Sequence, residues 1–488
     1  MAPEKSLCRS PDGEKLVTDH TTCIHERPHV DEQALKLDNH GIPLSPQPSA
    51  DLKDPLNWPK WLNVLVQISA LSFTTYISAS MVSPAFVPLS RYLHRNLSDT
   101  AYTTSIVLAT TGVSTFLWNP LSNVLGRRPI WLLCLLGSAA TSAASGAARN
   151  FEVLLTLRTL AGICTGIPQA LGSPTVCDMY FAHERGFYMG LYAVSSIAGA
   201  HAAPLLGGFV ARAGGWRWTF YGAAVGFAAL LLPFVLSVPE TLFSRSPAAL
   251  AQAQDRSWRD NLLMRGRQRA GKKRLTALEF VHTWQMLVCS SVLLPALYLV
   301  VSLGYGSIIF VLSGPAIFSS LYGFAPHQIG MVVGLSLTLG NLAREMFVGG
   351  FCDWVSETRA LQRVLTPAGL ILEGFCIQLW THWSGPAIGI AVSSVGFQII
   401  MTVVFTYTAE CYKSQAAHTG TIINFFRDIF GFCVAFYDLK MGEMLGFQAA
   451  WTILAVINVT LFFPVLILFW KGEQWRERLG SPQFDQDL

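Results

Sequence analysis

Long apolar stretches separated by short polar turns dominate the chain from residue 62 onward. Twelve of them have about 20 residues each, the length that a helix needs to cross the hydrocarbon core of a bilayer. They cover residues 62–86, 101–121, 129–148, 152–176, 187–211, 217–238, 287–312, 328–350, 364–383, 386–409, 417–437 and 447–470. The sequence lacks the alternating segments of a membrane β-barrel, so we predict an all-α membrane protein with twelve transmembrane helices.

Polar segments divide this pattern into domains. Residues 1–60 are hydrophilic and typical of a disordered cytosolic tail, and residues 240–284 form a basic connector between the sixth and seventh spans. We therefore predict two six-helix bundles, at 61–239 and 285–470, followed by a short cytosolic tail at 471–488. Lys and Arg gather in the loops on the side of the N-terminus, so the positive-inside rule places both termini in the cytosol of a cell membrane protein.

The two halves share a weak internal repeat. Span one ends in SPAFVPLSRYL (83–93) and span seven in GPAIFSSLYGF (314–324). Nearly the same offset carries the turn NPLSNVLGRRPI (119–130) onto GGFCDWVSETR (349–359), with Asp353 at the place of Asn123. Parallel six-helix repeats are typical of one transporter architecture.

Composition excludes several functions. Only 13% of the residues are charged, against about 25% in an average soluble protein. The net charge of +4 is too small to indicate a nucleic-acid partner. No paired Cys or His spacing indicates a metal site, no phosphate-binding loop is present, and no cluster of nucleophile and base indicates an enzyme.

The turn at 119–130 is polar for a loop between two apolar spans. Gly126 permits a tight bend, and Arg127 and Arg128 are expected at the cytosolic face near anionic headgroups. Asn123 can form hydrogen bonds but carries no charge.

These motifs resemble the major facilitator superfamily, across all twelve spans. The loop pattern G-x-L-x-D-R-x-G-R-[RK] is matched at its Gly126, Arg127 and Arg128 end, with Asn123 in place of the Asp. Span five resembles the antiporter pattern G-x-x-x-G-P-x-x-G-G, and span four the pattern R-x-x-x-G-x-x-x-G. The matching residues are Gly199, Pro204, Gly207 and Gly208 in span five, with Ala203 replacing one Gly, and Arg158, Gly162 and Gly166 in span four.

Three further segments are similar to the fungal branch of drug:proton antiporters: DPLNWPKW (54–61), PET (239–241) and AECYKSQAAHTGTIINFFRDIFGF (409–432). The resemblance implies the major facilitator fold and proton-coupled efflux of a drug or secondary metabolite by alternating access. It implies that a proton gradient drives transport and that no cofactor is needed. The expected partners are a small-molecule substrate and the bilayer. We expect a monomer. The alternative is proton-coupled uptake of a polyamine or another small nutrient.

Ionisable side chains inside spans are costly and are therefore functional candidates. The candidates for proton coupling or gating are Arg158, His201, Arg344, Glu345, Arg427 and Asp428. The resemblance assigns proton coupling to Arg158, which from shallow depth can instead reach water. Adjacent residues of a helix point about 100° apart, so Arg344 and Glu345 are not expected to pair. His201 can also be a packing residue, and Glu373 is expected to be one.

The resemblance also assigns conformational roles. The loop carboxylate of the family helps to latch one state, a charge that Asn123 lacks and that Asp353 retains in the second half. The glycines of span five, with Pro204, imply tight packing that prevents leak. Polar and aromatic candidates for the substrate cavity are Gln67, Tyr76, Tyr305, Asn341, Gln398 and Asn424. Asn96 opens an N-glycosylation tripeptide in the first predicted outer loop.

Overall fold

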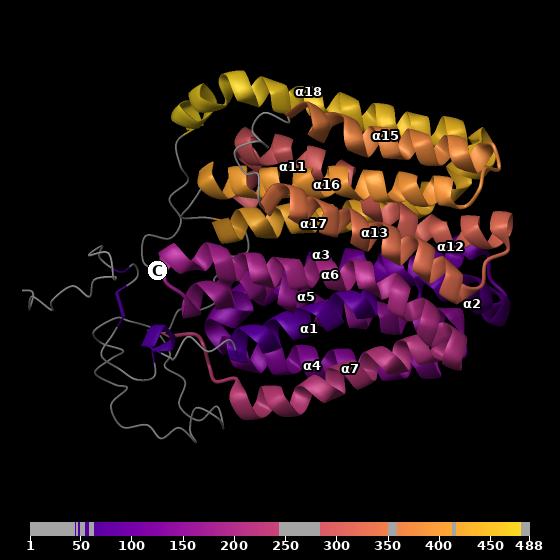
Figure 1. Cartoon of the computed structure of the whole chain (residues 1–488). Helices are drawn as coiled ribbons and strands as arrows, with labels where there is room; N and C mark the ends of the chain where they lie inside the picture. Colours follow the sequence, from indigo (N-terminus) through magenta and orange to yellow (C-terminus); the bar gives the residue numbers. More distant parts are fainter. Residues whose placement is uncertain are drawn as a thin grey trace, which may run out of the picture. The chain divides into compact units, whose positions relative to one another are not determined.

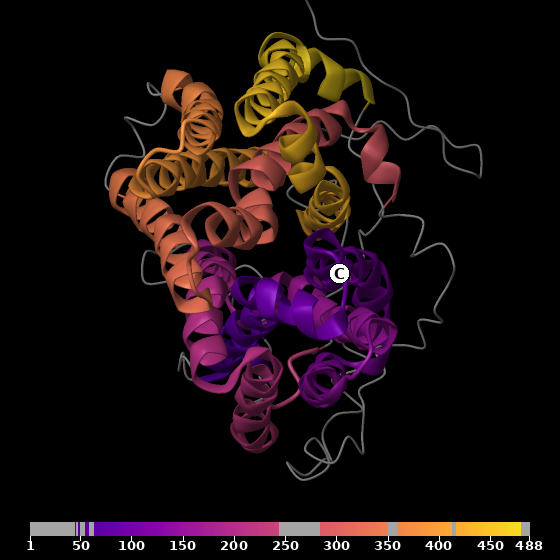
Figure 2. The same cartoon turned by 90° about the vertical axis from the view of Figure 1, so that its right-hand side faces the viewer.

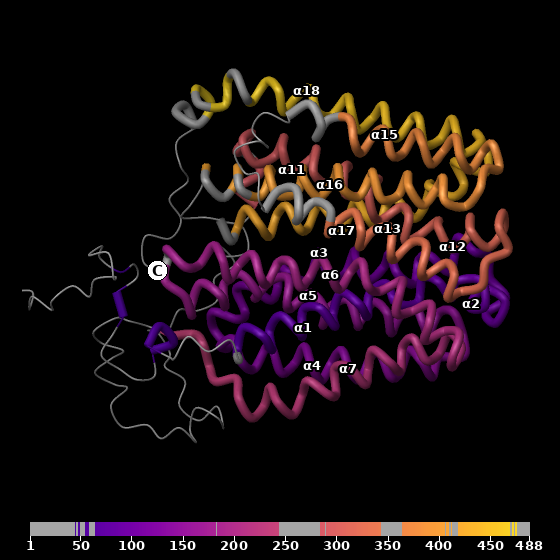
Figure 3. The backbone as a smooth tube through the Cα atoms, in the orientation of Figure 1, coloured from indigo at the N-terminus to yellow at the C-terminus, as the bar shows by residue number. Residues whose placement is uncertain are grey.

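A computed structural model describes residues 44, 47–48, 54–57, 63–243, 284–349, 359–411 and 416–479; the remaining residues are grey in Figure 3. The chain divides into two units, residues 1–48 and 49–488. In the first, the Gln47 side chain donates a hydrogen bond to the Leu44 carbonyl at 2.8 Å. The second unit carries the helices discussed below, and no strand occurs among the residues described.

The first group of helices holds the first six predicted spans and lies in the lower part of Figure 1. Its elements are η1 (Pro55–Asn57), α1 (Asn63–Ser80), η2 (Ser83–Ala85), α2 (Phe86–Leu93), α3 (Leu97–Leu125), α4 (Arg127–Ala147), α5 (Phe151–Met179), α6 (Ala182–Gly214) and α7 (Trp216–Ser237). We call this group the N half.

The second group holds the other six predicted spans and lies above the first in Figures 1 and 2. Its elements are η3 (Met286–Val288), α11 (Ser290–Leu303), the π-helix η4 (Gly304–Ile308), α12 (Ile309–Tyr322), α13 (Pro326–Gly349), α15 (Arg359–Gln378), α16 (Ser384–Cys411), α17 (Ala416–Leu445) and α18 (Phe447–Leu479). We call this group the C half. Each predicted span thus coincides with one helical stretch, and spans one and seven extend beyond their predicted ends as α2 and α12.

Eight helical stretches in the described ranges are long and apolar enough to cross a membrane by length and mean hydropathy alone. The other predicted spans correspond to α3, α13, α15 and α17, and α17 carries Arg427, Asp428 and Asp438. Helix α3 packs along α17, and α13 packs along α6, so these four helices form the two most extensive contacts between the halves. Burial against a helix of the other half shields polar groups from lipid, which explains why α3 and α17 are less apolar.

The two ends of the bundle are packed differently. We name them after Asn96, which precedes α3, and Arg127, which begins α4. One large apolar cluster includes Phe86 and Leu89 of the N half together with Phe310 and Phe318 of the C half. A second cluster, which reaches the Arg127 end, contains buried residues of the N half alone.

Contact between the halves also occurs toward the Arg127 end, where Phe116 of α3 stacks on Trp284 with ring centroids 4.9 Å apart. The shared apolar core nevertheless lies at the Asn96 end, where α2 and η2 pack against α12. The described conformation is therefore sealed at the Asn96 end.

Candidate functional site

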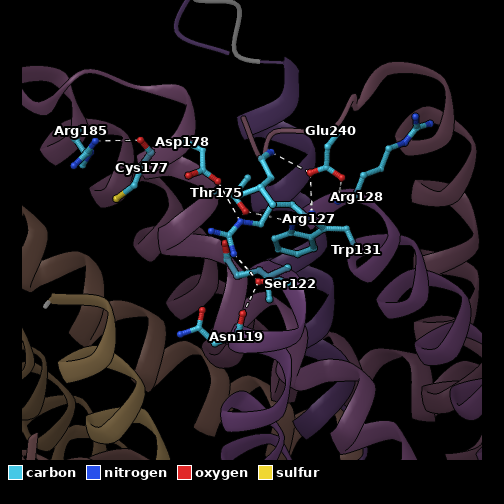
Figure 4. A network of polar contacts seen from close by, with 12 residues as sticks. Asn119, Ser122, Arg127, Arg128, Trp131, Thr175, Cys177, Asp178, Arg185 and Glu240 are labelled. Atoms are coloured by element: carbon cyan, nitrogen blue, oxygen red, sulfur yellow. Dashed lines mark hydrogen bonds and ion pairs between the residues drawn. The ribbon is translucent and has the colours of Figure 1, made fainter. Parts of the chain in front are cut away.

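The turn between α3 and α4 is held by a carboxylate from the end of α7. The backbone N–H groups of Arg127 and Arg128 donate to Glu240 at 2.8 and 3.2 Å (Figure 4). The first N–H groups of a helix have no partner within the helix, and the positive end of its dipole favours an anion. Glu240 therefore caps α4, although burial raises the pKa of its carboxyl and those N–H groups act in the opposite direction.

Gly126 makes this capping possible. Its φ is +93°, a conformation that other residues rarely adopt, and a Cβ at this position would lie 2.5 Å from Glu240 Oε2. The tight bend thus brings the start of α4 directly onto the carboxylate.

Both arginines of the turn lie inside the protein, only 6% and 2% exposed. Arg127 donates to Asp178 of α5 at 3.1 Å and to Ser122 of α3 at 2.5 Å (Figure 4). Arg128 donates to the Val235 carbonyl of α7 at 2.8 Å. The expectation that they lie near lipid headgroups is therefore wrong: each is drawn inward by acceptors on neighbouring helices. Together they join α3, α4, α5 and α7.

Other residues of this region are placed as follows. Arg185 donates to the carbonyls of Cys177 and Tyr180 at the end of α5. The side chain of Asn123 is exposed. Asp353, its predicted counterpart in the second half, lies outside the described residues.

Arg158 is buried in the N half with 1% of its surface exposed. Its guanidinium donates to the carbonyls of Thr103, Ser78 and Ala79 at 2.9, 3.1 and 2.6 Å, and lies 5.4 Å from the Phe220 ring centre. The alternative in which Arg158 reaches water is thus contradicted. Its hydrogen-bond acceptors are backbone groups of α1 and α3.

Another arginine, largely shielded from solvent, lies between the halves. Arg427 of α17 donates to Asp428 at 2.9 Å and to Gln169 of α5 at 3.0 Å. The Gln169 amide in turn donates to the other carboxylate oxygen of Asp428 at 2.9 Å, and the Tyr76 hydroxyl hydrogen-bonds to Arg427. Although adjacent in the chain, Arg427 and Asp428 pair, because the long arginine side chain reaches back to the carboxylate. We call these four residues the interhalf cluster.

A glycine lets the interhalf cluster form. A Cβ on Gly112 of α3 would lie 2.9 Å from Asp428 Cβ, so a larger residue would push α17 away. Asp428 itself is only 2% exposed. Its carboxylate is thus held in the middle of the protein by groups from both halves.

The small residues of α6 face two different neighbours. A Cβ on Gly199 would lie 2.5 Å from the Phe73 oxygen of α1, and a Cβ on Gly207 would lie 1.9 Å from the Met81 oxygen in the turn after α1, so both would collide with backbone. A Cβ on Gly208 would lie 2.7 Å from the Pro326 oxygen of α13, in the C half. Pro204 lies within α6 between these contacts. Backbone approaches this close leave no room for water between the helices.

The remaining candidates are dispersed. His201, Asn341 and Gln398 are buried at the α6, α13 and α16 junction, and Tyr305 of η4 accepts a hydrogen bond from Tyr437 at 3.3 Å. The Gln67 side chain donates to Ser237, and the Glu373 carboxylate accepts a hydrogen bond from Trp451 at 3.0 Å. Asn424 is half-buried in α17, and Asn96 is exposed before α3. Arg344 and Glu345 lie in α13, and their side chains are outside the described residues.

Sequence reasoning missed Gln169, Gly112, Glu240 and Asp438. Glu240 lies in the PET segment, a signal that pointed to the family without assigning a contact. Gln169 and Gly112 are uncharged residues in apolar spans, so only the fold shows that they meet Asp428. Asp438 is a buried carboxylate, 3% exposed, at the end of span eleven, and the rule on ionisable residues in spans should have included it.

The described residues contain no group of three His, Cys, Asp or Glu side chains placed to hold a metal ion. A cavity of about 370 Å³ lies at the Asn96 end, where Pro84, Pro88 and Arg91 face Phe324 and Pro326 of the C half.

Comparison with known proteins agrees with this architecture. The chain is 26% identical over 465 residues to "Efflux pump radE" of Floropilus chiversii, covering 90% of this chain and 85% of the relative. It is 25% identical to "MFS-type transporter penM" of Penicillium rubens, covering 89% of each. Among solved structures, a D-xylose-proton symporter has the same fold, with a TM-score of 0.63 at 12% identity, covering 84% of this chain and 97% of the symporter.

The model of the Major Facilitator Superfamily matches residues 68–435, most of the chain. The predicted fold class is confirmed, with two pseudo-repeats whose second and fifth helices pack on the fifth and second helices of the other half. Members of this family move solutes across membranes and are not enzymes. The chain is a multi-pass membrane transporter that belongs to the Major Facilitator Superfamily.

Proposed function

We propose that this transporter exports a small organic molecule, a drug or secondary metabolite, in exchange for protons. The observation that carries this proposal is the interhalf cluster, in which Asp428 is bonded to a cation beside it and to an amide of the other half. The N and C halves would move around a central site, exposing it to one side of the membrane at a time.

Asp428 is the residue through which a proton would act. As a carboxylate it accepts bonds from both Arg427 and Gln169, whereas a protonated carboxyl loses its charge and one acceptor position. Protonation would leave Arg427 without its counter-ion and would change a contact that joins the halves. A proton thereby shifts the balance between two arrangements, since it binds them with different affinity.

The packing of α6 supports exchange. An antiporter must not let protons pass without cargo, and Gly199, Gly207 and Gly208 bring α6 against α1 and α13 with no space for a water path. The relative named as an efflux pump supports export as the direction.

The seal at the Asn96 end fits the same direction. The positive-inside rule predicts that both termini lie on the cytosolic side of the cell membrane, so the Asn96 end faces the outside of the cell. A transporter closed there is in the state that takes up cargo from the cytosol. We propose that the chain does so as a monomer, driven by the proton gradient without a cofactor.

Sealed inside-out vesicles test this proposal. With an acid interior, the full chain should drive the fluorescent compounds ethidium or Nile red into the vesicles, and a protonophore should abolish this accumulation. Asp428→Asn should remove the dependence on the gradient, whereas Asp99→Asn at the start of α3 should retain it. Accumulation in right-side-out vesicles with an acid exterior would instead indicate uptake, and no gradient-driven movement in either orientation would contradict the proposal.

A further inference from the structure

Several buried side-chain atoms in the described part of the chain have no hydrogen-bond partner, and three of them belong to α6, α13 and α16. They are Nδ1 of His201, Oδ1 of Asn341 and Nε2 of Gln398. Their side chains are only 3%, 9% and 1% exposed. Buried polar atoms without partners are rare in folded proteins, because water satisfied them before folding. Such atoms often mark a place that a ligand completes.

The Asn341 and Gln398 side chains lie on facing turns of two neighbouring helices. Ser394 of α16 donates to the Leu337 carbonyl of α13 at 3.2 Å. Gln398 follows Ser394 by four residues and Asn341 follows Leu337 by four, so each lies one turn further along its helix on the same interface. A Cβ on Gly340 would lie 2.7 Å from Ser394 Cβ, which shows how closely these helices approach.

His201 reaches this level from the N half. Its ring packs edge-on against Phe397 of α16, with ring centroids 6.3 Å apart. Phe397 is the neighbour of Gln398 in the chain. One turn away on α6, Leu205 packs against Gly334 of α13, so the two helices are in close contact beside His201.

These groups complement one another chemically but are not bonded to one another. Gln398 offers an amide donor, Asn341 a carbonyl acceptor, and His201 a ring nitrogen that donates or accepts according to tautomer. None of the three carries a charge in its neutral form. A ligand that presents one acceptor and one donor side by side would satisfy the amide donor and the carbonyl acceptor together.

We propose that His201, Asn341 and Gln398 bind an uncharged hydrogen-bonding group of the cargo, a carbonyl with a neighbouring hydroxyl or amide, on an organic ring. This inference rests on the proposed function, since it names the chemistry of the exported molecule. His201 here acts as a hydrogen-bonding contact to cargo. Because it belongs to the N half and the two amides belong to the C half, a molecule bonded to all three joins the halves.

Equilibrium binding tests the assignment without any gradient. The purified full chain in detergent is titrated with carbostyril, a fluorescent ring lactam that is uncharged at neutral pH and whose carbonyl and N–H groups are neighbours. Gln398→Leu and Asn341→Leu should each weaken binding about three- to tenfold, the effect of one lost hydrogen bond. Gln328→Leu, the same change at an exposed position, should leave binding unchanged. The N-methyl derivative of carbostyril, which lacks the donor, should lose affinity for the wild type and be insensitive to Asn341→Leu.

Thermal unfolding without ligand separates binding from folding. Because the Gln398 amide donor has no partner among the described residues, Gln398→Leu should unfold at the wild-type temperature or above. Equal carbostyril affinity in the wild type and both variants, or no binding to the wild type, would overturn the assignment. Gradient-driven movement of ethidium in vesicles of the same variants decides the proposed function separately, since it does not depend on carbostyril binding.

Discussion

Arg158 and Arg427 are both arginines buried in long helices, but their acceptors differ. Arg158 donates to three backbone carbonyls, and all of them belong to α1 and α3 of its own half. Arg427 donates to the carboxylate of Asp428 and to Gln169, a residue of the other half.

The difference shows how one residue type serves two purposes. A backbone carbonyl cannot take up a proton, so the contacts of Arg158 persist whatever the pH and hold three helices as one rigid body. A carboxylate can be protonated, so the contacts of Arg427 depend on a proton and link bodies that move. Contacts inside a half should therefore determine stability, and contacts between halves should determine coupling.

The largest effect is expected from Arg158→Leu. It removes the guanidinium donor from three buried carbonyls, and the free energy of unfolding should fall by at least about 3 kcal/mol. Thermal unfolding in detergent and the yield of folded protein measure this. Arg158→Lys should restore only part of the stability, since a single ammonium cannot reach all three acceptors in one plane. A stable Arg158→Leu protein whose transport has an altered pH dependence would contradict the comparison between Arg158 and Arg427. Proton coupling would then depend on a residue whose contacts all lie inside one half.

Substitutions of neighbouring glycines in α6 also test the distinction between contacts inside a half and contacts between the halves. Gly207→Ala should destabilise the N half by about 1–3 kcal/mol, because its Cβ would overlap the Met81 oxygen. Gly208→Ala faces Pro326 of the C half and should chiefly slow transport by altering how the halves approach. Gly190→Ala is the matched control in the same helix: a Cβ there meets nothing within 4 Å. Unfolding temperatures and vesicle transport rates together distinguish the three, and equal effects of Gly207→Ala and Gly208→Ala on both measurements would contradict the distinction.

Asp428→Asn should lower gradient-driven transport at least tenfold, which corresponds to about 1.4 kcal/mol. The variant also leaves Arg427 buried without a counter-ion, so unfolding temperature should fall as well. Arg427→Gln added to Asp428→Asn removes that stranded charge and should recover the unfolding temperature without recovering transport. Recovery of both the unfolding temperature and transport would show that the Arg427 and Asp428 pair serves only the stability of the fold.

The smallest effect concerns Glu240, a contact inside the N half. Burial raises the pKa of its carboxyl, so the folded chain holds this proton more tightly than the unfolded chain. The stability that Glu240 contributes is therefore greatest below the ordinary pKa of a Glu carboxyl, and it falls as the pH rises through the raised pKa. Glu240→Gln should remove this slope and change the free energy of unfolding by about 1 kcal/mol. The unfolding temperature measured against pH checks this prediction. The control Glu152→Gln changes an exposed carboxylate and should keep the wild-type slope. A slope that persists in Glu240→Gln would show that another group causes the pH dependence.

The helices were predictable because lipid imposes a simple rule on sequence. A span must be apolar for about 20 residues, and each of the twelve predicted stretches coincides with a helix. The less apolar α3 and α17 could still be identified from their length and their place in the order. Their polarity was explained only by the fold, which packs them on one another.

The contacts of the candidate site were harder to predict. Arg158, Arg427 and Asp428 were identified because a charge inside a span is costly, a property of each residue alone. Gln169 and Gly112 could not be identified, because their importance depends on a helix that is distant in the chain. The Gln169 and Asp428 side chains form a hydrogen bond although 259 positions separate the two residues in sequence.

The π-helix η4 interrupts span seven between α11 and α12, with Tyr305 inside it. A π-turn holds one residue more than an α-turn, and such turns occur frequently at functional sites. Each residue turns an α-helix by about 100°, so the extra residue rotates the side chains of α12 relative to those that a continuous α-helix would present. The π-turn therefore sets which side chains of α12 face the neighbouring helices, and the Tyr437 hydroxyl bonds Tyr305 at the place where this rotation occurs.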